Sequence, residues 1–134
     1  KYAIAYSLIN LAIVHYNEKE YKKALEYLEK SQSIQERLEL PKPPLSTAIY
    51  LNLVYKHLNN KYNLKDIQNL IKETENIGYE FNFRLYELFE DNSYLEKAYN
   101  IIQEQVDTME HILKENYLNY PIPKAIVEEW EQHI

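Results

Sequence analysis

The chain has 134 residues, of which 46% are hydrophobic and 27% charged, with one glycine, five prolines and no cysteine. This length suits a single domain, and the scarcity of glycine argues against tight hairpins and phosphate-binding loops, so neither a β-rich nor a Rossmann-like fold is expected. Without cysteine there are no disulfides or thiolate metal sites, which favours a cytoplasmic protein.

Charge is spread unevenly along the chain. Residues 1–72 carry 11 Lys and Arg against 7 Asp and Glu, a net charge of +4, whereas residues 73–134 carry 4 against 14, a net charge of −10. An acidic second half does not suit a nucleic-acid backbone, and no apolar run approaches membrane-spanning length. We therefore expect neither a nucleic-acid nor a membrane partner. Because the sequence begins with Lys1 and not Met, we expect it to be a piece of a longer protein.

Residues 8–31 are predicted to form two helices that fold back on each other across a polar turn at 17–20. Apolar and small residues recur at helical spacing on both segments. They are Leu8, Leu11, Ala12 and His15 on the first helix and Tyr21, Ala24, Leu25 and Leu28 on the second. Ala12 and Ala24 would let the two helices approach closely. The second helix is expected to continue to about residue 40, before the prolines within 41–44.

A second pair of helices is predicted between residues 45 and 78. Its apolar positions are Ile49, Tyr50, Leu53, Val54 and His57 on the first helix and Leu64, Ile67, Leu70 and Ile71 on the second. The expected caps are Ser46 or Thr47 for the first helix, and Asn63 and Gly78 for the start and end of the second. The pair Asn52-Leu53 follows Asn10-Leu11 by 42 residues, and His57 follows His15 by 42, so the second pair is a degenerate repeat of the first.

A third pair is predicted over residues 80–120. Leu95, Ala98 and Ile102 repeat Tyr21, Ala24 and Leu28 at a constant offset of 74 residues. Ser93 is the expected cap of a second helix that continues to Tyr117, roughly 40 Å long at ~1.5 Å per residue.

Pro121 and Pro123 break the chain, and a short final helix is predicted with Pro123 in its first turn, a position that suits proline. Its Trp130 is expected to be mostly buried. The apolar residues that it would cover are Met109, Ile112 and Leu113 on the preceding long helix.

In the first pair, the order Leu8, Leu11, Ala12, Tyr21, Ala24 and Leu28 resembles the tetratricopeptide repeat. His15 replaces the usual aromatic residue and Ser31 the later alanine. The spacing of 42 exceeds the usual ~34 and is similar to long-repeat members such as kinesin light chain. The resemblance implies an all-α, right-handed superhelical solenoid of antiparallel helix pairs. The repeats would cover 1–40, 45–78 (degenerate) and 80–120, with a capping helix over 121–134.

The tail is similar to a second group of proteins. The run YLNYPIPKAIVEEW, residues 117–130, resembles the end of helical-repeat regions in large bacterial ATPase- or cyclase-linked regulators. This resemblance implies a regulatory setting in a larger bacterial protein.

The tetratricopeptide resemblance also implies a concave groove, lined by the first helix of each pair, that binds an extended peptide or a partner helix. The candidate groove residues are Ile9, Asn10, Ile13, Asn52, Tyr55, Arg84 and Glu87. Asn10 and Asn52 stand two residues before the small residue, where an amide can both donate to and accept from a peptide backbone. A clamp for a C-terminal carboxylate is disfavoured, because only Asn52 and Arg84 match its pattern. Glutamates of the third pair favour a basic partner segment.

No constellation of residues indicates catalysis, so we expect neither an enzyme nor a bound cofactor. His15 and His57 are interpreted as packing residues between helices. As zinc ligands they would need a further ligand that the spacing does not supply, so no metal site is expected.

The sequence therefore predicts a protein–protein interaction module, either monomeric or weakly dimeric. The alternative is a peptide-sensing domain that controls an attached effector.

Overall fold

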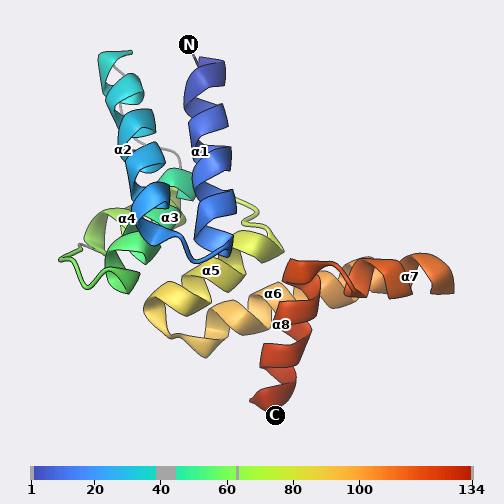
Figure 1. The fold of residues 1–134 in the computed structure, drawn as a ribbon. Coiled ribbons are helices and arrows are strands. Elements are labelled where there is room, and N and C mark those ends of the chain that lie inside the picture. The colour runs from blue at the N-terminus through green and yellow to red at the C-terminus, as the bar shows by residue number, and fades with distance from the viewer. Residues whose placement is uncertain (1, 39–44, 63, 134) are drawn as a thin grey trace. The chain divides into compact units, whose positions relative to one another are not determined.

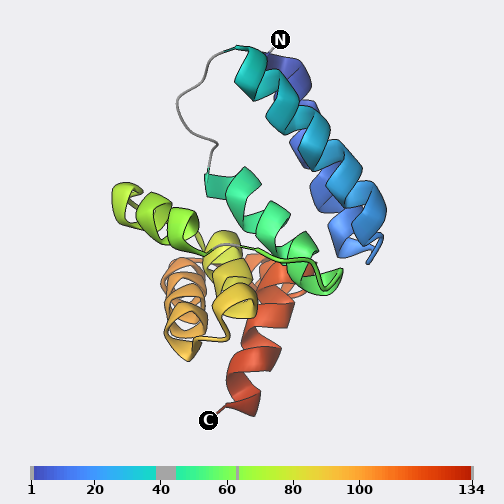
Figure 2. The same ribbon diagram turned by 90° about the vertical axis from the view of Figure 1, so that its left-hand side faces the viewer.

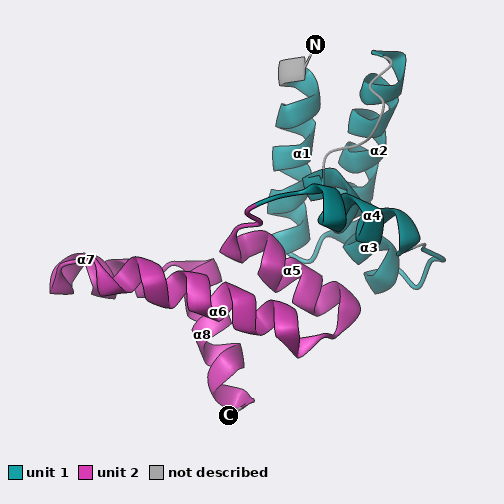
Figure 3. Ribbon diagram, turned by 180° about the vertical axis from the view of Figure 1, so that it is seen from behind, with its two compact units in different colours: residues 1–75 teal, residues 76–134 magenta. Residues whose placement is uncertain are grey.

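The computed structural model describes residues 2–38, 45–62 and 64–133, and every regular element within them is a helix, which confirms the all-α class (Figure 1). The helices are α1 (Tyr2–Asn17), α2 (Tyr21–Arg37), α3 (Leu45–His57), α4 (Lys65–Glu73), α5 (Tyr79–Phe89), α6 (Asn92–Asp107), α7 (His111–Leu118) and α8 (Pro121–Gln132). Two compact units divide the chain, residues 1–75 and residues 76–134 (Figure 3). In the part of the chain described, no helix has both the length and the apolar character needed to cross a membrane.

The first unit is built on the α1–α2 hairpin, whose two helices run side by side (Figure 2). Ala12, Ala24 and Leu28 are fully buried, as the sequence predicted. The Ser31 hydroxyl, also buried, donates a hydrogen bond of 3.1 Å to the carbonyl oxygen of Ala5, which links the two helices.

The buried face of α1 is rotated from the predicted one. It consists of Ala5, Ile9, Ala12 and Tyr16. Leu8 and His15 are half-buried and Leu11 is exposed, so the predicted face of Leu8, Leu11, Ala12 and His15 was wrong apart from Ala12. The physical reason is that α1 is apolar on nearly every side, so that periodicity alone does not select the face that packs.

Helix α3 is buried over most of its length, and it contacts α1, α2 and α4. Leu53, Val54 and Ile67 are fully buried, as predicted. The predicted cap was wrong, because Ser46 and Thr47 lie inside α3, and Thr47 is buried. Asn63, the predicted cap of the next helix, lies outside the described residues.

Helix α4 ends earlier than predicted. Its last residue is Glu73, and the Thr74 hydroxyl donates 2.6 Å to the carbonyl of Leu70. Gly78 therefore does not end α4 but precedes α5 as its N-cap, with φ −72. The left-handed conformation expected of a glycine after a helix occurs instead at Asn76, a residue that tolerates it.

The core of the second unit joins α5, α6 and α8. It contains Phe83, Leu95, Ala98, Ile102, Val106 and Ile126, all buried. The three α6 positions predicted from the offset of 74, Leu95, Ala98 and Ile102, are fully buried, which confirms that part of the pattern. The cap of α6 is Asp91, whose carboxylate accepts 2.9 Å from the backbone N–H of Ser93, so the prediction of Ser93 as the cap was wrong.

The long helix predicted to reach Tyr117 is broken. Helix α6 ends at Asp107 and α7 begins at His111. The Thr108 hydroxyl donates 3.1 Å to the carbonyl of Gln105, and Glu110 is extended, with φ −66 and ψ 154. A hydroxyl that bonds to the preceding turn competes with the helix ladder, and this competition favours a break here although the apolar spacing continues.

The tail helix α8 begins at Pro121, with Pro123 in its first turn, as predicted. Trp130 is half-buried and stacks on Tyr99 of α6 with ring centroids 5.1 Å apart. Two of its three predicted contacts were wrong, because Ile112 and Leu113 on α7 are exposed, whereas Met109 packs against the same core as Trp130. The tail thus covers α5 and α6, and α7 stays largely uncovered.

We expect stability to fall above about pH 10, the ordinary tyrosine pKa. Burial, followed by the neighbouring Tyr79, raises the pKa of Tyr117 to about 12. Between these values the unfolded chain releases the Tyr117 proton while the folded chain keeps it, so the free energy of unfolding decreases as pH rises; below pH 10 this contribution is fully present. Urea unfolding on both sides of pH 10 measures the slope.

The matched variants for this test are Tyr117→Phe and Tyr120→Phe, since Tyr120 is exposed. Tyr117→Phe should flatten the decrease, and Tyr120→Phe should leave it as in the unmodified chain. An equal slope in all three proteins would contradict the expectation.

Candidate functional site

The candidate groove residues of the first helix differ in their accessibility. Asn10 is exposed on α1 and Ile13 is half-buried. Ile9 is only 4% exposed, because it belongs to the packed face of α1. The prediction that Ile9 offers an open apolar contact to a ligand was therefore wrong.

Asn52 and Tyr55 lie on α3, which contacts α1, and both are half-buried. The Asn52 side-chain amide donates 2.8 Å to the carbonyl of Ala48, which leaves its carbonyl oxygen and its second N–H for a further hydrogen bond. Burial, and to a lesser degree the Glu29 carboxylate, raises the pKa of the Tyr55 phenol, so this side chain stays neutral.

The remaining two candidates, Arg84 and Glu87, belong to the second unit and pair with each other. Arg84 Nη1 donates 2.6 Å to Glu87 Oε1, one turn away on α5. Arg84 is only 6% exposed, and its guanidinium lies 5.7 Å from the centre of the Phe83 ring. Since a ligand would have to separate this pair, neither side chain is poised to bind one.

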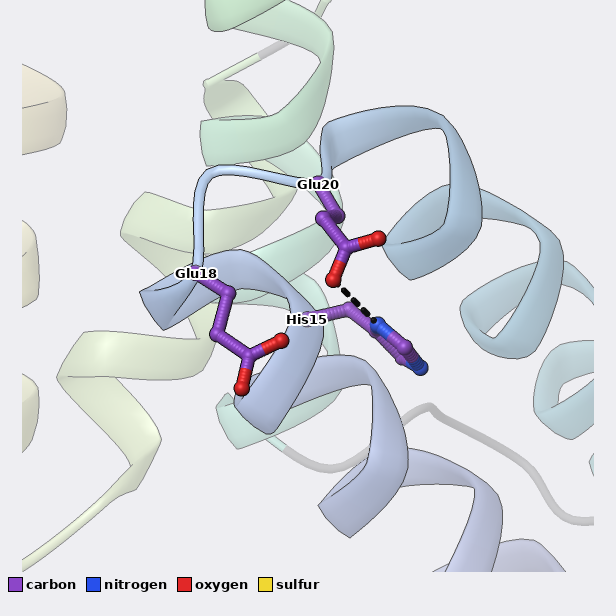
Figure 4. Close-up of side chains that lie close together, drawn as sticks. All are labelled: His15, Glu18 and Glu20. Atoms are coloured by element: carbon purple, nitrogen blue, oxygen red, sulfur yellow. Dashed lines mark hydrogen bonds and ion pairs between the residues drawn. The ribbon is translucent and has the colours of Figure 1, made fainter.

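The turn between α1 and α2 brings three metal-ligating side chains together, His15, Glu18 and Glu20 (Figure 4). Their ligand atoms all lie within 4.8 Å of one another, and His15 Nδ1 is 3.4 Å from Glu20 Oε1. The expectation that no carboxylate reaches His15 was therefore wrong. Lys19, with φ 64, has a left-handed conformation in this turn. Helical spacing applies only within a helix, so it does not predict which side chains such a turn brings together.

One carboxylate of this cluster, Glu20, is already paired with a protein cation. Hydrogen bonds, first with Glu18 and then with Lys23 and His15, lower the pKa of Glu20. The Lys23 ammonium lies 3.2 Å from Glu20 Oε2. One imidazole and two carboxylates are ligands that suit Zn²⁺, but here a lysine neutralises one of the carboxylates, so the geometry does not require a cation.

Both predicted histidines pack against aromatic rings of neighbouring helices, which confirms their interpretation as packing residues between helices. The His15 ring stacks on Tyr27 of α2 at 5.3 Å. The His57 ring stacks on Tyr21 of α2 at 4.2 Å, and its Nε2 lies 3.3 Å from the hydroxyl of Tyr16. His57 thus joins α3 to the first hairpin.

A polar cluster in the second unit links α5 to α8. The Tyr86 hydroxyl donates 3.0 Å to Glu129 Oε2 and lies 3.0 Å from Nε2 of His133. Burial, followed by the hydrogen bond to Glu129, raises the pKa of Tyr86, which keeps the phenol protonated as a donor. A neutral phenol is not an activated nucleophile. The two contacts of Tyr86 instead hold the tail helix against α5.

The helical spacing did not predict an exposed apolar face of α1, which carries Ile4, Leu11 and Val14. Tyr6, beside this face, is also exposed. Near one end of this face, a cavity of about 340 Å³ is lined by Ile4, Ile34, Arg37 and Leu38. The signal was present in the sequence, because residues 2–17 contain no Asp, Glu, Lys or Arg.

Comparisons with protein-family models, with curated proteins and with solved structures found no match for this chain.

Proposed function

We propose that this chain is a protein–protein interaction module that binds a peptide or a partner helix. The observation that carries the proposal is the surface of α1, a helix without a charged residue that is only partly covered. Soluble monomers rarely expose a contiguous apolar surface, and where one is exposed it often marks a binding site. The proposal assigns no catalytic role to the chain.

The resemblance to tetratricopeptide repeats adds a geometry to this proposal. In a superhelical solenoid the peptide would lie along the first helices of successive pairs, α1 and α3. Exposed Asn10 and the free carbonyl oxygen of Asn52 would then bond to its backbone. The similarity of the tail extends the proposal to a regulatory segment of a larger cytoplasmic bacterial protein.

The proposal is centred on the first unit. Glu87, which was expected to attract a basic segment, is paired with Arg84, so a cation from a partner would have to compete with a guanidinium at 2.6 Å. A basic partner would therefore gain little at this position, since exposed ion pairs contribute at most about 1 kcal/mol.

A peptide selected from a random displayed library against the whole chain tests this function. The affinity of the selected peptide is then measured for the unmodified protein, for Asn10→Ala and for Ser33→Ala, an exposed control on α2. We expect Asn10→Ala to weaken binding by about fivefold, the value of one hydrogen bond of about 1 kcal/mol, without changing the thermal midpoint.

Failure to enrich any peptide over a blank surface would contradict the proposed function. Equal affinities of the Asn10→Ala and Ser33→Ala variants would mean that the peptide binds away from Asn10. This result would contradict the groove geometry but not the interaction function.

A further inference from the structure

One face of α1 lies opposite its buried residues and carries a line of apolar side chains interrupted by one serine. It comprises Ile4, Ser7, Leu11 and Val14, spaced by three or four residues, which we call the outer stripe. Its three large side chains are 57%, 44% and 51% exposed, in chain order. A helix that is apolar all round is ordinarily covered on every side, so this face is suited to a partner surface.

We propose that the outer stripe is the interface with a second copy of this chain, packed antiparallel about a two-fold axis level with residue 9. In that register Val14 of the partner subunit lies level with Ile4, and Leu11 of the partner subunit lies level with Ser7. A large side chain then faces a small one at each central level, which is the alternation that lets two helices interdigitate closely.

The cavity at one end of the outer stripe fits the same register. It is lined by Ile4, Ile34, Arg37 and Leu38, at the level where Val14 of the partner subunit arrives. A valine side chain entering this apolar cleft would bury its own surface and that of Ile4 together. Because the two copies are related by a two-fold axis, the same contact is made twice.

Charge at the ends of the stripe favours a second copy over an unrelated helix. Glu18, which is exposed, follows Val14 by one turn, and Arg37, also exposed, lies at the Ile4 end. Antiparallel pairing therefore places Glu18 of the partner subunit near Arg37. The two-fold axis places Glu18 near Arg37 of the partner subunit at the other end. Parallel pairing would instead place the two Glu18 carboxylates together, and the helix dipoles would oppose each other.

The outer stripe does not include Asn10 or the α3 residues of the proposed peptide site. Both proposals use the uncovered surface of α1, self-association through the outer stripe and peptide binding through Asn10 beside it. Sedimentation measures the first and peptide affinity the second, so the failure of one is distinguishable from the failure of the other.

Sedimentation equilibrium of the full chain over a range of concentrations tests the proposal. We expect a reversible monomer–dimer equilibrium, which Leu11→Asp weakens by at least about tenfold, a change of 1.4 kcal/mol. Tyr6→Asp is the matched control, because Tyr6 is an exposed apolar residue of the same helix that lies off the stripe. This variant should change the dissociation constant by less than about threefold. Circular dichroism confirms that each variant is folded.

A charge-reversal pair tests the register with substitutions at exposed positions only. Glu18→Lys and Arg37→Glu should each weaken the dimer, and the double variant should restore it. A monomer at every concentration up to about 1 mM overturns the proposal. Equal effects of Leu11→Asp and Tyr6→Asp, or no restoration by the double variant, also overturn it.

Discussion

Ile126→Ala is expected to destabilise the second unit by about 2–5 kcal/mol, the range for emptying a fully buried aliphatic position. The Ile126 side chain is completely buried among residues of α5 and α6, and it is the fully buried member of α8 in their shared core. The cost is large because the cavity left by three missing carbon atoms lies between three helices, and none of them can move in without losing other contacts. Urea unfolding followed by the fluorescence of Trp130, which stacks on Tyr99, measures the loss.

The matched control is Lys124→Ala on the same helix, since Lys124 is exposed. It should change the free energy of unfolding by no more than about 0.5 kcal/mol. If Ile126→Ala is as mild as Lys124→Ala, then α8 does not share a core with α5 and α6.

Ala24→Leu is expected to destabilise the α1–α2 hairpin by about 1–3 kcal/mol, the usual cost of overpacking. Ala24 and Ala12 are both completely buried where the two helices pack closely. A leucine at position 24 would force the helices apart or adopt a strained rotamer. It would also disturb the buried hydrogen bond from Ser31 to Ala5. Loss of helical circular dichroism on heating, together with faster amide hydrogen exchange in α1 and α2, measures this effect.

Lys22→Leu supplies the comparison, because it introduces the same side chain at an exposed position two residues away on α2. Leucine is a good helix former, so this control should leave stability nearly unchanged. Stability of the Ala24→Leu protein equal to that of the control would mean that the hairpin is not closely packed at this point.

The sequence by itself determined the helical class and the best-defined helix faces. Leu28 on α2 and Leu95, Ala98 and Ile102 on α6 are fully buried, as their spacing predicted. On these helices charged residues occupy the other faces, so only one face can be buried without cost, and the periodicity of the sequence contains that information.

The tertiary structure alone decided the face of α1 that is buried. Its residues are apolar or neutral on all sides, so Ile9 and Leu8 are equally suitable for burial by composition, and only the contacts with α2 and α3 distinguish them. For the same reason the sequence did not predict that the outer stripe is exposed, because Leu11 has the same chemistry as a leucine of the core.

The tertiary structure also decided what turns and breaks bring together. Glu18 and Glu20 reach His15 because Lys19 adopts a left-handed conformation between them, and the helical register of the sequence does not extend through that residue. Likewise α6 ends at Asp107 although apolar residues continue at helical spacing, and the break coincides with a local hydrogen bond from Thr108 and extended backbone at Glu110. Periodicity reports which residues prefer burial, whereas turns and long-range contacts decide which of them find a partner.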